Sequence, residues 1–260
     1  MTERVASSSA AGHSVDEEVR ARTRPARKPV RFLPIEATAA ELLNSLFAAP
    51  VAVAIAAPSA DSVLLPDEQA IIGHAVPARR LEFATVRACA RSALRQLGCP
   101  DASSVAIPVG ADRAPIWPSG YLGSLSHCKD LCAAVAARQS SCRALGIDVE
   151  AWVEIEAAMI ELICTADEIE RFSSDAILPL PQLALLSFSA KEAFYKAYHP
   201  LTKQFLEFGD LSVRLIASEA DGGGFAVQLR PSLPMSGAAC CFVGSWRRLG
   251  DHVFTGVTCL

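Results

Sequence analysis

The chain lacks any apolar run of the roughly 18 residues that a membrane-spanning helix needs. Its longest apolar run, residues 48–58, is short and interrupted by prolines, and it predicts a buried strand instead. Residues 1–31 contain no apolar segment of the kind that a secretory signal carries. These absences predict a cytoplasmic protein.

A strong excess of one charge is also missing. The formal net charge is −4, which argues against a protein whose whole surface binds polyanions. Nine cysteines, an odd number without framework spacing, are typical of reduced thiols. His127, Cys128 and Cys132 lie close together in the sequence, but no second ligand pair follows at finger spacing and Cys132 opens an apolar stretch. The pattern therefore does not predict a zinc site.

The chain does have ample apolar surface. Hydrophobic residues make up 51% of its 260 residues, enough for one large domain or two small ones. Residues 1–30 are rich in Ser, Ala, Glu and Arg without apolar periodicity, and they predict a disordered extension. Structure is expected to begin near residues 30–33.

Helix-start signals and hydrophobic periodicity predict the first elements. Proline and acidic residues predict a helix beginning at residues 65–68, and a second helix is expected over residues 77–97. Four arginines share one face of that second helix: Arg80, Arg87, Arg91 and Arg95. Such a stripe indicates either a solvated face or an anion-binding surface.

The density of Pro and Gly in residues 108–123 predicts a structured loop. Two apolar runs, 131–137 and 144–149, predict a hairpin. A capping box predicts a short helix over residues 165–172, and a long helix is expected from about residue 182 to a stop at Pro200.

The last third alternates between apolar and polar residues, which predicts antiparallel strands with residues 222–224 as a turn. Helices followed by antiparallel strands indicate an α+β class.

Two carboxylates lie in the segment Gly-Ile-Asp-Val-Glu at residues 146–150. On a strand, residues two apart point to the same face, so Asp148 and Glu150 share a face if Ile147 and Val149 point into the core. Adjacent carboxylates raise each other's pKa unless a cation joins them, and a hard divalent ion prefers such oxygen ligands. The alternative is a pair of exposed acids on a hairpin edge.

A second motif, Phe-Ser-x-Lys-Glu-Ala-x-x-Lys, occupies residues 188–196. Glu192 and Lys196 are neighbours on one helix face, and the alternative to a functional role is an ordinary surface ion pair. A third motif, Gly-Ser-Leu-Ser-His, ends at His127, which either binds a phosphate or is an unremarkable loop residue.

The order and spacing of these motifs resemble the 4′-phosphopantetheinyl transferase superfamily, Sfp type, and are similar to its enterobactin synthase component D-like and actinobacterial single-chain members. The resemblance covers roughly residues 60–215. Supporting motifs are Arg-Arg-x-Glu-Phe-x-x-Val-Arg at residues 79–87 and Pro-x-Trp-Pro at residues 115–118.

The resemblance implies an enzyme that transfers the 4′-phosphopantetheine arm of coenzyme A to a serine of an apo acyl, polyketide or peptidyl carrier protein. The reaction would need Mg²⁺, release adenosine 3′,5′-bisphosphate, and serve secondary metabolite biosynthesis. The implied metal ligands are Asp148, Glu150 and Glu192, and the implied catalytic residues are Glu192, Lys196 and Asp148. The implied coenzyme A contacts are Arg79, Arg87, Gly110, Arg113, Ser126, His127, Asp148, Glu192 and Lys196.

The roles also follow from the resemblance. Glu192 would take the serine proton, directly or through a water, and Lys196 would contact the transferring phosphate. Several relatives carry Lys where this chain has Val109, and Arg113 is a candidate replacement for that charge.

The implied fold has two similar halves in a pseudo-twofold arrangement, with the active site in the cleft between them. The expected halves are residues 31–145 and 146–260, and a monomer is expected. Two other functions compete: a catalytically inactive carrier-binding scaffold, and a Mg²⁺-dependent phosphohydrolase that uses the same acids.

Overall fold

The structure, a computed structural model, describes residues 37–174, 178–230 and 242–260. The expected extension over residues 1–30 and the expected start at residues 30–33 lie outside these ranges. None of the helices within them combines the length and the apolar character that crossing a bilayer requires. The helices are α1 (Ala37–Asn44), α2 (Pro66–Ile72), α3 (Pro77–Gln96), α4 (Ala157–Ile163), α5 (Ala166–Ser173) and α6 (Leu180–Thr202), with a short 3-10 helix η1 (Phe208–Asp210).

The strands form two antiparallel sheets, so the mixed helix and sheet class is confirmed. The first sheet has the order β1-β3-β2 and the second the order β4-β8-β7-β6-β5. In each sheet, a long helix follows the first strand, and the last strand returns to pair with that first strand. The strands are β1 (Ala52–Ala56), β2 (Tyr121–His127), β3 (Cys132–Arg138), β4 (Ala144–Ala151), β5 (Leu211–Glu219), β6 (Gly222–Leu229), β7 (Phe242–Leu249) and β8 (His252–Cys259).

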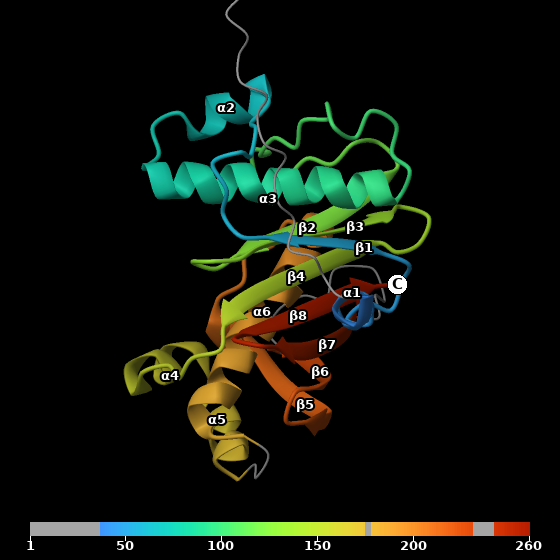
Figure 1. The fold of residues 1–260 in the computed structure, drawn as a ribbon. Coiled ribbons are helices and arrows are strands. Elements are labelled where there is room, and N and C mark those ends of the chain that lie inside the picture. Colours follow the sequence, from blue (N-terminus) through green and yellow to red (C-terminus); the bar gives the residue numbers. More distant parts are fainter. Residues whose placement is uncertain (1–36, 175–177, 231–241) are drawn as a thin grey trace, which may run out of the picture.

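Helix α3 packs on the three-stranded sheet because the strands present small residues to it. Ala52 and Ala54 of β1 belong to the core beneath α3, whereas Val53 and Ile55 point to the opposite face. There they join Ile147, Val149 and Phe254 in a core shared with the five-stranded sheet. Figure 1 shows α3 on one side of the three-stranded sheet and β4 and β8 on the other.

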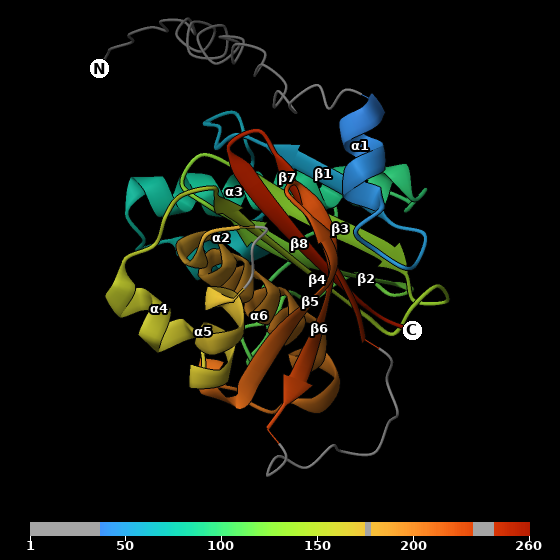
Figure 2. The same cartoon turned by 90° about the horizontal axis from the view of Figure 1, so that it is seen from below.

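Helix α6 packs on the five-stranded sheet, flanked by α4 and α5 (Figure 2). Its backbone approaches β4 closely at Gly146, where an added Cβ would lie 1.8 Å from the carbonyl oxygen of Ala193. Only glycine is compatible with that approach. The first residue of the Gly-Ile-Asp motif therefore brings the helix that carries Glu192 and Lys196 against the strand that carries Asp148.

The predicted hairpin over residues 131–137 and 144–149 is wrong. Strand β3 pairs with β1 on one edge and β2 on the other, so no edge remains for β4, which pairs with β8. The connection of residues 139–143 carries the chain from one sheet to the other instead.

Two local boundaries also differ from the predictions. Residues 222–224 lie in β6 rather than in a turn, where they pair with β5 and β7. Glycine is needed at 223 because an added Cβ would lie 2.7 Å from Ser218 Cα. Helix α6 continues past Pro200 to Thr202, since a proline in the last turn removes only one helical hydrogen bond. It ends at Lys203, which has a left-handed φ of 57°.

The arginine stripe of α3 is not one solvated surface. Arg91 is buried and donates to Glu68 of α2 over 2.6 Å, and Glu68 also accepts from the backbone N–H of Ile107. A buried carboxylate is thus the anion that Arg91 binds. Arg87 is buried as well, while Arg95 contacts Ser103 at the surface.

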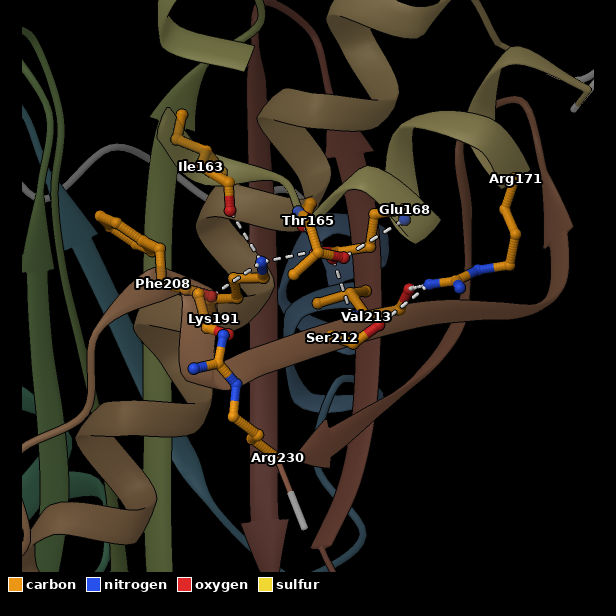
Figure 3. A network of polar contacts seen from close by, with 11 residues as sticks. Ile163, Thr165, Glu168, Arg171, Lys191, Phe208, Ser212, Val213 and Arg230 are labelled. Atoms are coloured by element: carbon orange, nitrogen blue, oxygen red, sulfur yellow. Dashed lines mark hydrogen bonds and ion pairs between the residues drawn. The ribbon is translucent and has the colours of Figure 1, made fainter. Parts of the chain in front are cut away.

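A second buried ion pair joins α6 to α5 (Figure 3). The ammonium of Lys191 donates to Glu168 over 2.8 Å and to the carbonyls of Ile163 and Phe208. Glu168 also accepts from the backbone N–H of Val213, and both charged side chains are fully buried. Burial alone would raise the pKa of Glu168, but the hydrogen bonds from Lys191 and the backbone hold it below its ordinary value. The network fixes α5, α6 and β5 together.

Replacing Glu168 with alanine should strongly destabilise the fold, because it leaves the Lys191 ammonium buried without its anion. We expect Glu168→Ala to lower the free energy of unfolding by about 3–5 kcal/mol in urea titrations. Glu170→Ala, an exposed glutamate of the same helix, should change it by less than about 0.5 kcal/mol. Equal unfolding midpoints for the two variants would contradict the anchoring role of this pair.

Candidate active site

A pocket of about 1220 Å³ lies where the two sheets meet their helices. Residues of α3, β2 and the 109–117 loop line one side, and residues of β4, α6 and the segment after it line the other. Every predicted site residue except Gly110 lines this pocket: Arg79, Arg87, Arg113, Ser126, His127, Asp148, Glu150, Glu192 and Lys196. The structure thus brings together side chains from both halves of the sequence.

Asp148 is the most enclosed acid of the pocket, with only 2% of its surface exposed. Its Oδ1 accepts hydrogen bonds from Ser126 and from the ammonium of Lys196, both over 2.7 Å. Its Oδ2 accepts from Ser189 over 2.8 Å. The alternative of an exposed acid on a hairpin edge is therefore wrong for Asp148, which is a buried and fully hydrogen-bonded carboxylate.

Two serines of β2 accept hydrogen bonds from backbone N–H groups on the free edge of β4. Ser124 accepts from the backbone N–H of Ile147 over 3.1 Å, and Ser126 accepts from that of Val149 over 3.3 Å. Residues two apart on a strand face the same way, so the Ser-x-Ser spacing matches the N–H groups along the edge of β4. These contacts join the two sheets, a role that the sequence motif alone did not indicate.

The carboxylates of Glu150 and Glu192 differ from that of Asp148, because no described residue donates a hydrogen bond to either. Burial, followed by the charge of Asp148, raises the pKa of Glu150 to about 8, although Lys196 opposes the shift. Burial also raises the pKa of Glu192, again against the effect of Lys196. Both carboxylates are placed where a further cation would relieve the cost of their ionisation.

The surface ion pair between Glu192 and Lys196, which was the alternative to a functional role for these residues, is not formed within 4.0 Å. Lys196 instead reaches across to Asp148, and it also donates to Ser126 over 3.1 Å and to the carbonyl of Ile147 over 3.3 Å. Helical spacing allowed the pair with Glu192, but a buried carboxylate on the facing strand offers a stronger partner than a half-buried one on the same helix.

The three carboxylates are the kind of ligand that a hard divalent cation prefers. The charges of Asp148 and Glu192 add to the raised pKa of Glu150, that of Asp148 adds to the raised pKa of Glu192, and Mg²⁺ and Ca²⁺ favour such oxygen ligands. The carboxylate oxygens of Asp148, Glu150 and Glu192 are not all within 4.8 Å of one another, so they do not form a closed cage. An ion here would take further oxygen ligands from water or from a bound phosphate, as Mg²⁺ commonly does.

The opposite side of the pocket is basic. Arg79 contacts the Nε2 of His127, and both side chains lie close to Glu82 of α3, at 3.3 Å and 3.4 Å. This places an arginine and a histidine from different elements next to each other at the pocket wall. Such a pair suits an anionic group with several oxygen atoms.

Arg87 supports the same basic side from within. Its guanidinium lies 3.5 Å from the centre of the Phe83 ring, and its Nε donates to the carbonyl of Ile107. Burial, with a smaller contribution from the charges of Arg79 and Arg91, lowers the pKa of Arg87 to about 10 against the opposing effect of Glu68. Arg91 is paired with Glu68, so Arg79 and Arg87 are the arginines of the pocket wall whose positive charge would stabilise a bound phosphate.

Of residues 108–123, which were predicted as a loop, residues 108–120 form one, with a single bridge between Val109 and Pro115. Residues 121–123 instead begin β2 and pair with β3. Val109 and Arg113 line the pocket, whereas Gly110 does not. Arg113 has a left-handed φ of 66°. At the pocket mouth, Asp112 of this loop pairs with Lys203 at the end of α6 over 2.6 Å.

The pocket also has an apolar wall that the predictions did not include. It consists mainly of Ile116, Trp117, Phe188, Tyr195 and Phe205. Phe205 is 76% exposed, which is unusual for an aromatic side chain. Aromatic spacing on α6 was visible in the sequence, but which face would line a pocket depended on the tertiary packing.

Two protein-family models match the chain. The 4′-phosphopantetheinyl transferase N-terminal domain matches residues 67–137, and the 4′-phosphopantetheinyl transferase superfamily matches residues 144–231. These ranges include all the predicted site residues, with the first covering the basic side of the pocket and the second the acidic side.

Curated relatives agree with the family models. The chain is 35% identical over 199 residues to the 4′-phosphopantetheinyl transferase Svp of Streptomyces mobaraensis, covering 75% of this chain and 78% of the relative. It is 39% identical over 166 residues to the 4′-phosphopantetheinyl transferase PptT of Mycobacterium tuberculosis, covering 62% and 68%. It is 36% identical over 141 residues to enterobactin synthase component D of Escherichia coli, covering 53% and 63%.

The raised pKa of Glu150 has a consequence for stability in the absence of a divalent cation. A carboxyl whose pKa rises from 4.5 to about 8 on folding contributes stability below pH 4.5 that is lost as the pH rises through 8. In EDTA, we expect the thermal midpoint to fall between about pH 5 and about pH 9 by more in the wild type than in Glu150→Gln. Glu161→Gln, at an exposed position, should follow the wild type. Parallel curves for the wild type and Glu150→Gln would contradict the shift.

Proposed function

Because the chain belongs to the 4′-phosphopantetheinyl transferase superfamily, we propose that it transfers the 4′-phosphopantetheine arm of coenzyme A to a serine of an apo carrier protein. The single observation that carries the proposal is the pocket, in which a basic wall faces three carboxylates with Lys196 beside them. This arrangement suits a diphosphate bound with a divalent cation. Adenosine 3′,5′-bisphosphate would be the leaving group.

In the proposed reaction, the serine oxygen forms a bond to the phosphorus next to the pantetheine arm, and the bond from that phosphorus to the bridging oxygen breaks. Glu192 accepts the serine proton, directly or through a water. Its carboxylate lies in the pocket and accepts no hydrogen bond from a described residue, which leaves an oxygen to take the proton. The negative charge leaves on the 5′-phosphate of the bisphosphate.

Asp148, Glu150 and Glu192 would hold Mg²⁺, whose chemistry is to neutralise the charge of the diphosphate and polarise its oxygens. Glu150 and Glu192 have carboxylates available for this role. Asp148 shares its oxygens with Ser126, Ser189 and Lys196. Lys196 can turn from Asp148 to a bound phosphate, since its side chain is one-quarter exposed.

The basic wall would hold the adenosine end of coenzyme A. Arg79, Arg87 and His127 are proposed to bind the 3′-phosphate or the diphosphate, because bidentate guanidinium groups match phosphate oxygens. Arg113 is proposed to supply the charge that relatives carry at the position of Val109. Ser126 would contribute to coenzyme A binding indirectly, by orienting Asp148. Gly110 would allow the 108–120 loop to approach the adenine.

We propose two similar halves, residues 31–145 and 146–260, related by a pseudo-twofold axis with the active site in the cleft between them. The repeated order of strand, long helix and returning strands supports this division. Residues from both halves of one chain line the pocket, which supports a monomer. The cytoplasm is proposed as the compartment in which it acts.

The transfer is tested by mixing the purified protein, Mg²⁺, coenzyme A and an apo carrier protein, and measuring the carrier's mass. We expect the carrier to gain the mass of the phosphopantetheine arm. Coenzyme A binding without modification of any acyl or peptidyl carrier would favour the inactive scaffold. Hydrolysis of the diphosphate without transfer would favour the phosphohydrolase.

In the same assay, we expect Glu192→Gln and Asp148→Ala to abolish transfer, because they remove the proton acceptor and the central carboxylate. Near-ultraviolet circular dichroism checks that both variants remain folded. Glu161→Gln should transfer at the wild-type rate. Turnover close to wild type in Glu192→Gln would rule out its role as the base.

Lys196→Ala should lower kcat by roughly a hundredfold while changing the affinity for coenzyme A much less, because the ammonium stabilises charge that develops during transfer. Initial rates at varied coenzyme A, together with calorimetric binding, separate the two effects. An equal loss in rate and in affinity would mark Lys196 as a contact to the bound ground state.

A further inference from the structure

The turn after β2 lies against the start of β8, outside the pocket. Cys128 and Asp130 belong to this turn, which is closed by a hydrogen bond from the backbone N–H of Cys128 to the carbonyl of Leu131. His252 is the first residue of β8. The turn comes from the three-stranded sheet and the histidine from the five-stranded sheet, so 122 positions in sequence separate Asp130 from His252.

Three different metal-ligating side chains converge at this junction. The Nε2 of His252 lies 3.0 Å from Asp130 Oδ1, and the Sγ of Cys128 lies 3.4 Å from the same oxygen. All three donor atoms are within 4.8 Å of one another. Among the described residues, no other group of three or more His, Cys, Asp or Glu side chains meets that spacing.

The separations match the edges of a tetrahedral zinc site. Zinc bonds of about 2.3 Å to sulfur and about 2.0–2.2 Å to nitrogen or oxygen place neighbouring ligand atoms about 3.3–3.7 Å apart. The measured 3.0 Å and 3.4 Å require only small adjustments of side chains that are partly exposed. His252 keeps 19% of its side chain exposed and Asp130 keeps 65%, which leaves an open side for water.

The spacing of His127, Cys128 and Cys132 along the sequence did not predict this group. His127 points to the other side of the strand, where it meets Arg79 and Glu82, and Cys132 donates to the carbonyl of Glu82. The structure therefore separates Cys128 from its sequence neighbours and places a distant histidine beside it.

We propose that Cys128, Asp130 and His252 form a binding site for Zn²⁺, with water as the fourth ligand. Neither the family models nor the proposed transferase function assigns a role to these residues. Thiolate and imidazole ligands select zinc over Mg²⁺, so the site is chemically distinct from the acidic side of the pocket. Binding transfers the thiol proton of Cys128 to solvent, as metal coordination by cysteine requires.

Zinc at this position would clamp the end of β2 to the start of β8. Ser126 and His127, which line the pocket, directly precede Cys128, so the clamp would hold the strand that carries them. Without the metal, burial raises the pKa of Cys128 to about 11, and the neutral thiol donates to Asp130. A ligand that binds only the folded chain raises the thermal midpoint as its concentration increases.

The test is to measure zinc binding to the full chain by competition with a chromophoric chelator, under reducing conditions. We expect one zinc ion per chain, and binding weaker by about tenfold or more in Cys128→Ser and in His252→Gln. Cys99→Ser and His74→Gln, a partly exposed cysteine and an exposed histidine elsewhere, should bind as the wild type. The variant Cys240→Ser/Cys241→Ser, which removes the two adjacent cysteines of the sequence as alternative thiol ligands, should also keep the zinc.

Co²⁺ provides a second readout that does not depend on activity. A tetrahedral site with one thiolate should give intense ligand-field bands and a sulfur-to-cobalt charge-transfer band, which Cys128→Ser abolishes. If Cys128→Ser unfolds in EDTA, Asp130→Ala changes an exposed side chain and should weaken zinc binding in its place. Zinc binding that survives in Cys128→Ser, His252→Gln and Asp130→Ala, or that disappears only with Cys240→Ser/Cys241→Ser, overturns the proposal.

Discussion

The burial of one carboxylate, that of Asp148, sets the arrangement on which the pocket depends. An ionised carboxylate removed from water is stable only if donors surround it. Asp148 finds them in Ser126 of β2 and in Ser189 and Lys196 of α6, all within 2.8 Å. Because β2 belongs to one sheet and α6 packs on the other, satisfying this charge fixes the two halves relative to each other.

Two further features hold the same junction. Gly146 lets α6 lie against β4, and Ser124 closes the edge of β4 on the side of β2. With the junction held in this way, the pocket has a basic wall on α3 and an acidic wall on β4 and α6. Phosphoryl transfer needs both charge types at one place, since the substrate is anionic and its metal is cationic. The constraint that stabilises the junction therefore also arranges the chemistry.

Local signals predicted the elements well, and distant pairing explains the errors. Helix α3 and the capping box at Thr165 follow from helix signals within a few residues, and the structure confirms them. The partner of Lys196 and the burial of Arg91 depend on strands and helices far away in sequence, where periodicity carries no information. The same is true of Cys128, whose sulfur lies close to a histidine of β8. Family resemblance, rather than periodicity, selected the residues that the structure gathers in the pocket.

Calorimetric titration of coenzyme A into the wild-type protein, with Mg²⁺ and with EDTA, measures whether the basic wall and the acidic trio bind one diphosphate through a shared divalent cation. If they do, Mg²⁺ strengthens coenzyme A binding, and Asp148→Asn removes most of this gain. The same affinity in Mg²⁺ and in EDTA would contradict a shared cation.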